Sequence, residues 1–596
     1  MFVLTPISPH LHPLRRLLSL GVLALVLLLG LSSCQIEQFR VRAADGSQII
    51  LGQLSDPKTF NAALSQESPN VFSYIYDGLV TSDGVTAEVI PELAESWETS
   101  EDNLRLVFTL REGLRWSDGE PLTADDVVFT FNDIYFNRRI PSSTRDVLRV
   151  GESGEFPTIQ KLDDRRIEVL LPEPFSPILR TLGSPILPEH ILRPAVEDVN
   201  EEGEPRFNTM WGTNTPPQEI ISNGPYRLSQ YAPGQRVRFE RNPYYWNEDD
   251  DGTPRPHIRS VVWQVVENQD TQLLQFRSGG LSSITVNPPY FSLLKQEEER
   301  GNFTIYEDGP QMGTTFISFN LNRGQNPNGR PLVDPIKSKW FNTLAFRQAV
   351  AHAIDRETMI NSIYRGLGEP QNSPISIQSP YYLSPDEGLP TYEYDLDKAR
   401  ELLLEAGFQY DARGRLLDED GNRVQFELIT NAGNQTREAI GAQIRQDLSQ
   451  IGIQVNFTPI DFNNLVNRLN NTLDWECHLI GFTGGVEPHG NLTIFAVDGR
   501  LHSFNQNRDD PPLEGRVVED WEREIESLYI QGAQVFGDEE RKEIYGQAQI
   551  LVQENLPFIY LVNPLSMAAV RNTIQGTQYS AIGGVFWNLP ELTIED

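Results

Sequence analysis

One segment, residues 91–134, constrains the fold of this 596-residue chain more closely than any other. Apolar residues occupy every second position from 104 to 110, which is the period of a strand with one buried face. A Ser-Asp-Gly turn at 117–119 follows, and Thr123 then provides an N-cap for a helix with two carboxylates in its first turn. The segment therefore predicts a strand, a turn and a capped helix.

Length, composition and charge limit the class of protein. The chain is too long for one hydrophobic core, so we expect about two to four domains. Apolar residues make up 39% and aromatic residues 10% of the sequence, as in ordinary globular proteins. The net charge of −34 argues against nucleic acid and against an anionic membrane surface as partners.

The N-terminus has the features of an export signal. Two arginines precede an apolar run at 17–31, which ends in a Leu-Ser-Ser-Cys sequence that resembles a lipobox. The run is shorter than the roughly 20 residues that a membrane-spanning helix needs. We expect residues 1–33 to be a signal peptide, Cys34 to be lipidated, and residues 34–46 to be the lipidated tether. The alternative is a cysteine that merely ends a secretory signal.

The cysteine content agrees with this interpretation. Cys34 and Cys477 are the two cysteines of the chain, so lipidation of the first leaves no partner for an intrachain disulfide. No CxxC motif is present, which removes the usual zinc and redox signatures. The exported chain must therefore be stabilised by burial of its core.

Three sequence blocks resemble a known family. They are Pro-x-Leu-Ala-x-Ser-Trp, Phe-x-Leu-Arg-x-Gly and Asp-Gly-x-Pro-x-Thr-Ala-x-Asp-Val within 91–127, the Asn-Gly-Pro-Tyr and Arg-Asn-Pro-x-Tyr-Trp sequences within 222–246, and the segment 345–366. Together they are similar to bacterial extracellular solute-binding proteins of family 5, the dipeptide-, oligopeptide- and nickel-binding components of ABC importers. The resemblance covers nearly all of residues 48–590.

The resemblance implies an α/β fold of the two-lobed periplasmic-binding-protein type (type II, cluster C) with an extra small domain. The expected parts are lobe I (47–73, 212–313 and 558–596), small domain II (74–211) and lobe III (314–557). The hinge is expected where the chain crosses between lobes, near 311–313 and 556–557. Independently of the resemblance, the alternating strands and helices after residue 421 predict βαβ units.

The resemblance also places a ligand cleft between the lobes. The expected cleft residues are Thr59, Phe60, Asn61, Tyr381, Tyr382, Phe482, Thr483, Gly484, Gly485 and Glu487. In peptide-binding relatives the loop reads Gly-Trp-x-x-Asp, and its Asp pairs with the peptide ammonium; here Gly485 stands at that position. Either Glu487 supplies the carboxylate after a small loop shift, or no ammonium is bound, because a buried ammonium without a counter-charge is costly. The glycine pair also predicts a close backbone approach to the ligand or to the other lobe.

Several other residues invite a metal or ligand role. The acidic turn at 248–252 suggests calcium at Asp249 and Asp251, but position 12 of such a loop is Ile258 rather than a bidentate Glu, which favours a solvated turn. Glu487 and His489, with Cys477 and His478, suggest a metal, and exposed loop polar groups are the alternative. Arg347 is expected as a buried ion-pair partner first and a ligand contact second.

These observations predict a lipid-anchored, monomeric substrate-binding component of an ABC importer on the extracytoplasmic face of the cell envelope. It binds a peptide-like solute, delivers it to permease subunits, and needs no cofactor and no metal. The alternatives are the same fold with a nickel chelate or an oligosaccharide, and a sensor or chaperone lipoprotein without a permease. A hydrolase is disfavoured because GxSxG, HExxH and P-loop motifs are absent.

Overall fold

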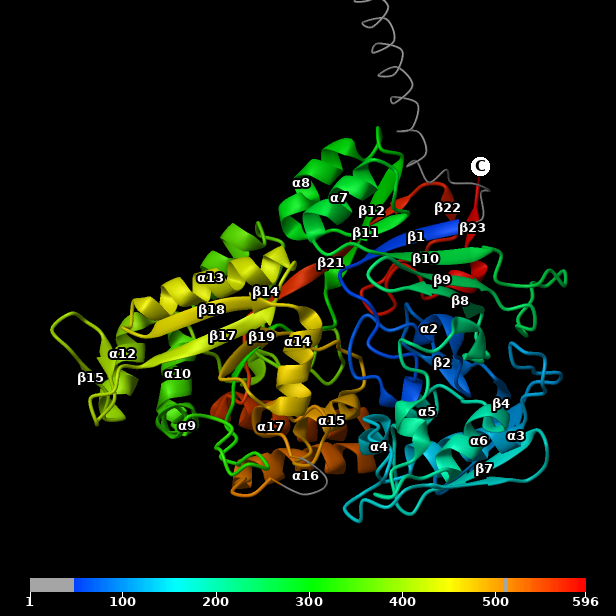
Figure 1. Ribbon diagram of the computed structural model, residues 1–596, viewed down its shortest axis with the longest axis horizontal. Coiled ribbons are helices and arrows are strands. Elements are labelled where there is room, and N and C mark those ends of the chain that lie inside the picture. The colour runs from blue at the N-terminus through cyan, green and yellow to red at the C-terminus, as the bar shows by residue number, and fades with distance from the viewer. Residues whose placement is uncertain (1–47, 508–512, 596) are drawn as a thin grey trace, which may run out of the picture.

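The computed structural model describes residues 48–507 and 513–595, which form two large sheets, one smaller sheet and the helices packed on them (Figure 1). The predicted signal peptide, Cys34 and the tether lie outside the described residues. Within the described ranges, no helix combines the length and the apolar character needed to cross a bilayer.

The largest sheet has eight strands and forms the body that we call lobe I. Its order is β12-β21-β11-β1-β10-β9-β8, with β14 also paired to β21. β1 runs parallel to β10 and β11, and the other pairs are antiparallel. Its strands and the helices beside it are β1 (Gln48–Gln53), β8 (Tyr226–Ala232), β9 (Arg236–Arg241), β10 (Ser260–Val265), β11 (Ser283–Thr285), β12 (Phe303–Pro310), β14 (Gly368–Pro370), β21 (Val562–Arg571), α7 (Gln269–Arg277) and α8 (Pro288–Glu297).

The five-stranded sheet, in the order β18-β17-β19-β13-β20, forms the body that we call lobe III. β17, α13 and β18 make a parallel βαβ unit, as predicted for this part of the chain. The elements of lobe III are β13 (Phe316–Phe319), α9 (Pro335–Asn342), α10 (Leu344–Ala353), α11 (Arg356–Thr358), α12 (Leu396–Glu405), β15 (Gln409–Tyr410), β16 (Leu416–Leu417), β17 (Gln425–Asn431), α13 (Gln435–Ser449), β18 (Gln454–Ile460), α14 (Phe462–Val466), β19 (Cys477–Ile480), α15 (Leu492–Phe495), α16 (Asp520–Gln534), α17 (Asp538–Asn555) and β20 (Ile559–Tyr560).

A four-stranded antiparallel sheet, β4-β5-β7-β6, forms the small domain. The capped helix predicted after Thr123 is present, because the Thr123 side chain accepts from the first turn of α3 while Asp126 accepts from the Thr123 backbone. The elements of this region are α2 (Phe72–Ile75), β2 (Val80–Ser82), β3 (Val89–Pro91), β4 (Ala94–Thr99), β5 (Arg105–Leu110), α3 (Ala124–Phe129), α4 (Thr144–Val147), β6 (Thr158–Lys161), β7 (Arg166–Leu170), α5 (Ile178–Thr181) and α6 (Glu189–Glu197). The C-terminal pair is β22 (Ile574–Gln575) and β23 (Thr593–Ile594).

The small domain and lobe I share one hydrophobic core. A single cluster of buried residues includes Ile49 of β1, Phe108 of β5 and Val261 of β10. The core of lobe III is a separate cluster that contains Phe316 and Leu428. The packing therefore divides the molecule into two bodies, with the small domain attached to lobe I.

Two chain segments cross between the bodies side by side. Gln311 N donates to Pro564 O at 2.9 Å, and Leu561 N donates to Thr315 O at 2.9 Å. The first crossing agrees with the expected hinge at 311–313. The second lies about five residues later than the expected 556–557, since Leu556 is buried in the lobe III core and β20 pairs with β13 before the chain leaves that sheet.

The sequence of residues 71–80 predicts a helix that closes at Gly78, and the structure has a shorter one. α2 ends at Ile75, and the chain is extended from Tyr76 onward. A Cβ on Gly78 would lie 2.3 Å from the backbone oxygen of Gly183, so this glycine allows two backbones to touch rather than ending a helix.

Candidate functional site

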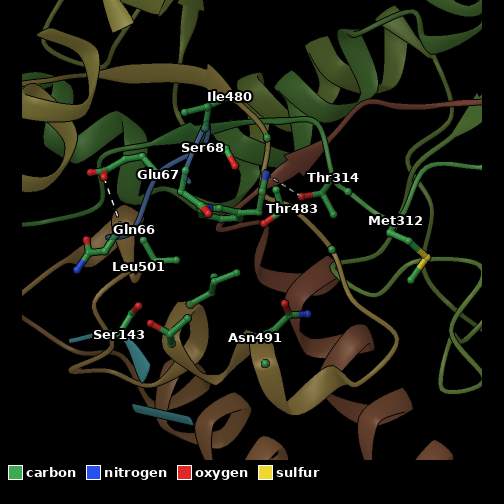
Figure 2. Close-up of a pocket in the computed structure, with 18 of the residues that line it drawn as sticks. Gln66, Glu67, Ser68, Ser143, Met312, Thr314, Ile480, Thr483, Asn491 and Leu501 are labelled. Atoms are coloured by element: carbon green, nitrogen blue, oxygen red, sulfur yellow. Dashed lines mark hydrogen bonds between the residues drawn. The ribbon is translucent and has the colours of Figure 1, made fainter. Parts of the chain in front are cut away.

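A cavity of about 840 Å³ lies between the two bodies, next to the crossing segments (Figure 2). Lobe I, the small domain and lobe III all contribute to its wall. The lining residues are Ala62, Ser65, Gln66, Glu67, Ser68, Asn70, Phe72, Ser143, Pro185, Gln311, Met312, Gly313, Thr314, Thr315, Arg437, Phe462, Val466, Leu469, Asn470, His478, Ile480, Gly481, Phe482, Thr483, Gly484, Gly490, Asn491, Thr493, Ile494, Leu501, Ser503, Pro564, Ser566 and Ala581. Its volume falls in the usual range of about 300–1,000 Å³ for small-molecule sites.

The wall is mostly uncharged and mixes polar with apolar side chains. Hydroxyl and amide groups are about as numerous as apolar side chains, which include the rings of three phenylalanines. Glu67 and Arg437 are the two lining side chains that carry charge at neutral pH. Burial raises the pKa of Glu67, and its carboxylate accepts a hydrogen bond from the backbone N–H of Gln66. Such a wall can bind a ligand mainly through hydrogen bonds.

Arg437 is the cation of the cavity. It stands in the first turn of α13, where its Nη1 donates to Asn431 Oδ1 at 2.9 Å. Among the described residues, no carboxylate oxygen lies within 4.0 Å of its guanidinium nitrogens, so it forms no ion pair there. Burial lowers the pKa of Arg437. A second cavity of about 490 Å³ abuts the first, and Arg437 lines both. The guanidinium therefore offers several N–H donors to a ligand in this space.

Arg437 is not among the residues expected in the cleft, although two features of its position point to it. It follows β17, which is a parallel strand, and ligands of α/β proteins bind outside the carboxyl ends of such strands. It also places a cation at a helix N-terminus, where the helix dipole disfavours positive charge. Because a positive charge there does not stabilise the helix, the arginine is more readily explained by a role in ligand binding.

In the loop predicted to recognise the ligand, the expected residues Phe482, Thr483 and Gly484 line the cavity, together with Gly481. A Cβ on Gly484 would lie 1.6 Å from the backbone oxygen of Met312, while no atom lies within 4 Å of a Cβ built on Gly485. The expected close approach therefore involves Gly484 and the crossing segment. Gly485 stands in open space outside the lining.

Glu487 does not take the place of the missing carboxylate. Its Oε1 lies 2.6 Å from Arg541 Nη2, and the two side chains are 14% and 6% exposed. Neither residue lines the cavity. The structure therefore brings no carboxylate from this loop to the cavity wall.

The expected residues Thr59, Phe60 and Asn61 lie just before the cavity rather than in its wall. Thr59 Oγ1 donates to Trp211 O at 3.3 Å, and Phe60 is fully buried. Asn61 caps the short helical turn that follows and donates to Phe207 O at 3.2 Å. These three residues hold the start of the lining segment that begins at Ala62.

Tyr381 and Tyr382 also lie outside the lining. The Tyr381 hydroxyl donates to Asp538 Oδ1 at 3.0 Å and accepts from Arg541 Nη1 at 2.6 Å. Burial raises its pKa to about 12. Tyr381 therefore belongs to the polar cluster that holds Glu487 and Arg541, none of which lines the cavity.

The residues considered as metal ligands in the sequence have other contacts in the structure. Among the described residues, no group of three or more His, Cys, Asp or Glu side chains is arranged to hold a metal ion. Asp249 instead forms an ion pair with Arg255 at 2.6 Å. Cys477 is completely buried, and His478 is buried between aromatic rings.

Arg347 has neither expected role. It is 4% exposed, and its guanidinium donates to two backbone carbonyls, Phe341 O at 2.6 Å and Asn555 O at 2.8 Å. These carbonyls lie at the C-terminal ends of α9 and α17, where helices present unpaired acceptors. Burial lowers the pKa of Arg347 to about 10.

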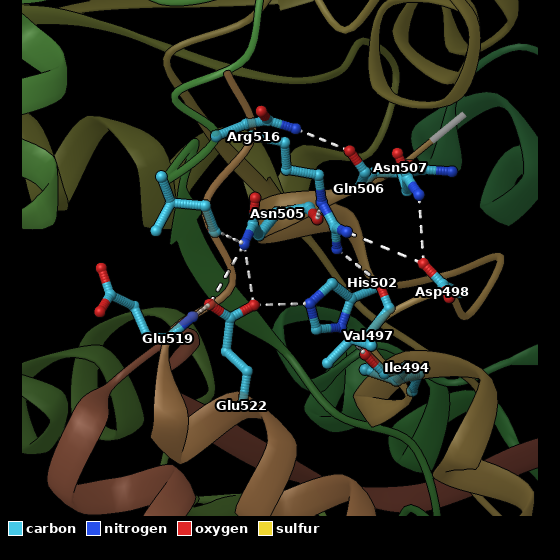
Figure 3. A network of polar contacts seen from close by, with 12 residues as sticks. Ile494, Val497, Asp498, His502, Asn505, Gln506, Asn507, Arg516, Glu519 and Glu522 are labelled. Atoms are coloured by element: carbon cyan, nitrogen blue, oxygen red, sulfur yellow. Dashed lines mark hydrogen bonds and ion pairs between the residues drawn. The ribbon is translucent and has the colours of Figure 1, made fainter. Parts of the chain in front are cut away.

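A buried polar network supports one wall of the cavity (Figure 3). Leu501 and Ser503 line the cavity, and His502 between them points away from it into lobe III. His502 Nε2 lies 2.9 Å from Glu522 Oε2, and Asn505 Nδ2 donates to the same carboxylate oxygen at 2.9 Å. The network fixes this wall on the N-terminus of α16.

Comparison with known proteins identifies the family. The profile of bacterial extracellular solute-binding proteins, family 5 Middle, matches residues 88–499. A probable ABC transporter-binding protein of Deinococcus radiodurans is 28% identical over 546 residues, which cover 88% of each chain. Oligopeptide-binding protein AppA of Bacillus subtilis is 25% identical over 579 residues, which cover 94% of this chain and 96% of AppA.

Solved structures share the fold. The structure of AppA in complex with a nonapeptide matches with a TM-score of 0.76 at 22% identity, over 92% of this chain and 99% of that chain. The periplasmic binding protein MelB of Agrobacterium fabrum, in complex with stachyose, matches with a TM-score of 0.79 at 19% identity, over 92% of this chain and 85% of that chain. The fold is thus that of two-lobed periplasmic binding proteins. Since the family profile spans more than half of its length, the chain belongs to the bacterial extracellular solute-binding proteins of family 5, which bind solutes for transport and are not enzymes.

Proposed function

We propose that this chain captures peptide-like solutes with a free carboxylate in the cavity between its lobes and delivers them to an ABC permease. The observation that carries the proposal is Arg437, a guanidinium that lines the cavity without a carboxylate partner among the described residues. A buried cation without a counter-charge is costly, so a solute that supplies the charge gains affinity. Arginine pairs with a carboxylate through two parallel hydrogen bonds.

The remaining wall suits a peptide backbone. Each peptide unit presents one N–H and one C=O, which need partners once they leave water. The hydroxyl and amide side chains of the wall, such as Asn70, Thr314 and Asn491, can supply these partners to solutes of varied sequence. The names of the relatives, oligopeptide-binding and dipeptide-binding proteins, agree with this solute class.

The second candidate solute is a sugar. The uncharged polar groups of the wall also suit hydroxyl groups, and the similarly folded MelB was solved with stachyose. A neutral oligosaccharide would leave Arg437 without a counter-charge, which is why we place it second.

The lipid anchor rests on the sequence around Cys34, which lies outside the described residues. A tether of about a dozen residues would keep the protein close to its permease at the membrane while leaving the lobes free to close. Membership of the family supports the proposed delivery to a permease. A sensor or chaperone role is the alternative if no permease acts with this protein.

Native mass spectrometry of protein purified from its own envelope tests the solute class directly. We expect bound species of peptide size. A spectrum with only an oligosaccharide or a metal chelate would overturn the peptide assignment.

The Arg437→Gln variant tests the carboxylate contact. With synthetic tetrapeptides, we expect Kd to rise about 10- to 100-fold for free C-termini, because a hydrogen-bonded charge pair is lost. Amidated tetrapeptides should bind wild type and variant alike. The matched control is Arg445→Gln, an exposed arginine on the same helix. Equal losses with free and amidated peptides would exclude Arg437 as the carboxylate contact.

A further inference from the structure

The small domain contacts lobe III at a site that we call the clasp. Its centre is formed by Asp146 and Val147 at the end of α4, which face His489, Thr493 and Arg500 of lobe III. Beside this centre, Gln534 of lobe III donates a hydrogen bond to Glu173 of the small domain. Figure 1 shows α4 beside α15, below the crossing strand β21 in this view. The clasp therefore joins the two bodies at a contact separate from the crossing segments.

Asp146 is the centre of the clasp. Its Oδ2 accepts hydrogen bonds from the Thr493 hydroxyl at 3.2 Å and from the Arg500 backbone N–H at 2.9 Å. The residue is 2% exposed, and burial raises its pKa although Arg145 and Arg149 lie nearby. Both hydrogen bonds come from lobe III, so separation of the bodies would break them together.

His489 makes a second bond across the same contact. Its Nε2 donates to the backbone oxygen of Val147 at 3.0 Å. Its ring packs edge-on against that of Phe175 in the small domain, with the ring centroids 4.9 Å apart. Next to it, the backbone N–H of Ser176 donates to Ala533 O at 2.7 Å. Every one of these bonds joins a residue of the small domain to one of lobe III.

The clasp also bounds the cavity. Ser143, the residue before α4, and Thr493, the partner of Asp146, both line it. The crossing segment Gln311–Thr315 lines it as well. A solute is therefore enclosed between the hinge on one side and the clasp on the other, and separation of the clasp opens a way out.

We propose that Asp146 is a positioning residue which, without touching the solute, holds the small domain against lobe III and so sets the balance between closed and open cleft. The proposal rests on the proposed function only in taking closure as the binding step. The carboxylate can do this because its two donors lie on the other body and its surroundings exclude water. Hydrogen bonds to a charged acceptor contribute more than neutral ones, and loss of both should change the closed-to-open ratio about tenfold or more.

The test measures closure without any solute, so that it does not depend on the solute class. Spin labels on cysteines introduced at Glu152 of the small domain and Glu539 of lobe III report the distance between the bodies; both positions are exposed. Cys34 is replaced by serine, and Cys477 is buried. We expect Asp146→Ala to move the distance distribution toward the open form, and Thr493→Val to move it in the same direction.

The control is Asp133→Ala, which removes an acid whose ion-pair partner, Arg193, lies in the same domain. It should leave the distribution unchanged, and circular dichroism should show that all variants are folded. Combining Asp146→Ala with Thr493→Val should add little to the first change, because both remove the same bond. A wild-type distribution that is already open, or one that Asp146→Ala leaves unchanged, would overturn the proposal. A solute other than peptide would leave it standing.

Discussion

At the scale of single residues, Gly484 and Gly485 differ in the space that their surroundings leave for a side chain. Gly484 lets the ligand loop touch the crossing segment, because a Cβ there would lie 1.6 Å from a backbone oxygen. Gly485 has open space around it, and its φ is not positive. Its lack of a side chain is therefore not required by the local packing or by the backbone conformation.

Substitutions at the two positions should separate these reasons. Gly484→Ala should lower the free energy of unfolding by about 2 kcal/mol or more, since the clash is with backbone and cannot be relieved by a side-chain rotation. Gly485→Ala should change it by less than about 1 kcal/mol. Urea unfolding of both variants measures the difference, and equal effects would contradict the geometry described.

Gly485→Asp extends the comparison to binding. If no ammonium is recognised in the wild type, N-acetylated and free tetrapeptides should bind within a few-fold of each other, and the variant should favour the free amine. A wild-type preference of about 100-fold, or about 2.7 kcal/mol, for the free amine would show that another carboxylate is used.

At the scale of elements, the network on α16 links the stability of a helix end to the shape of the cavity wall. Glu522 accepts from the Glu519 N–H at 2.8 Å in a capping box and also holds His502 and Asn505. Burial alone would raise the pKa of Glu522, but hydrogen bonds from His502, the Glu519 N–H and Asn505 hold the pKa below its usual value. One carboxylate thus positions the wall residues on either side of His502.

Glu522→Ala should leave His502 and Asn505 buried without their partner. We expect a loss of about 3 kcal/mol in the free energy of unfolding and faster hydrogen exchange at 501–507. Glu524→Ala, at an exposed position of the same helix, is the control and should change neither. If exchange at 501–507 is unaltered in Glu522→Ala, the network does not hold the wall.

How much of this could be predicted from sequence differs between elements and site. Elements with local signals were predicted well: the capped helix after Thr123 is present as α3, and the βαβ unit after residue 421 is present as β17, α13 and β18. α2 was predicted too long because its apolar residues are buried by tertiary packing rather than by a helical face. The cavity wall was predicted in part, at Phe482, Thr483 and Gly484, whereas Arg437 and Asn70 belong to it through contacts between distant segments.

At the scale of the whole molecule, acid should weaken lobe III through one buried histidine. His478 is 1% exposed, its ring nitrogens have no hydrogen-bond partner among the described residues, and burial lowers its pKa to about 3 from 6.5. Below pH 6.5 the imidazole is protonated in the unfolded chain but stays neutral in the folded chain. The contribution of His478 to the free energy of unfolding is therefore fully present above pH 6.5 and is lost as the pH falls toward 3.

This contribution amounts to about 1.4 kcal/mol per pH unit, or about 2 kcal/mol between pH 6.5 and 5. His478→Leu should remove that dependence, so urea unfolding at pH 7 and pH 5 should show a smaller loss for the variant than for the wild type. Identical losses would mean that the imidazole is protonated in the folded chain or is not buried.

The common core of lobe I and the small domain has a mechanical consequence. Two regions that share one packed interior cannot slide or rotate independently without exposing it, so the small domain must travel wherever lobe I goes. The molecule then consists of two rigid bodies joined by two crossing segments, and one hinge angle describes their relative motion. A contact that fixes this angle, whether it is the clasp or a bound solute, therefore also fixes the surface that the two bodies present to a membrane protein.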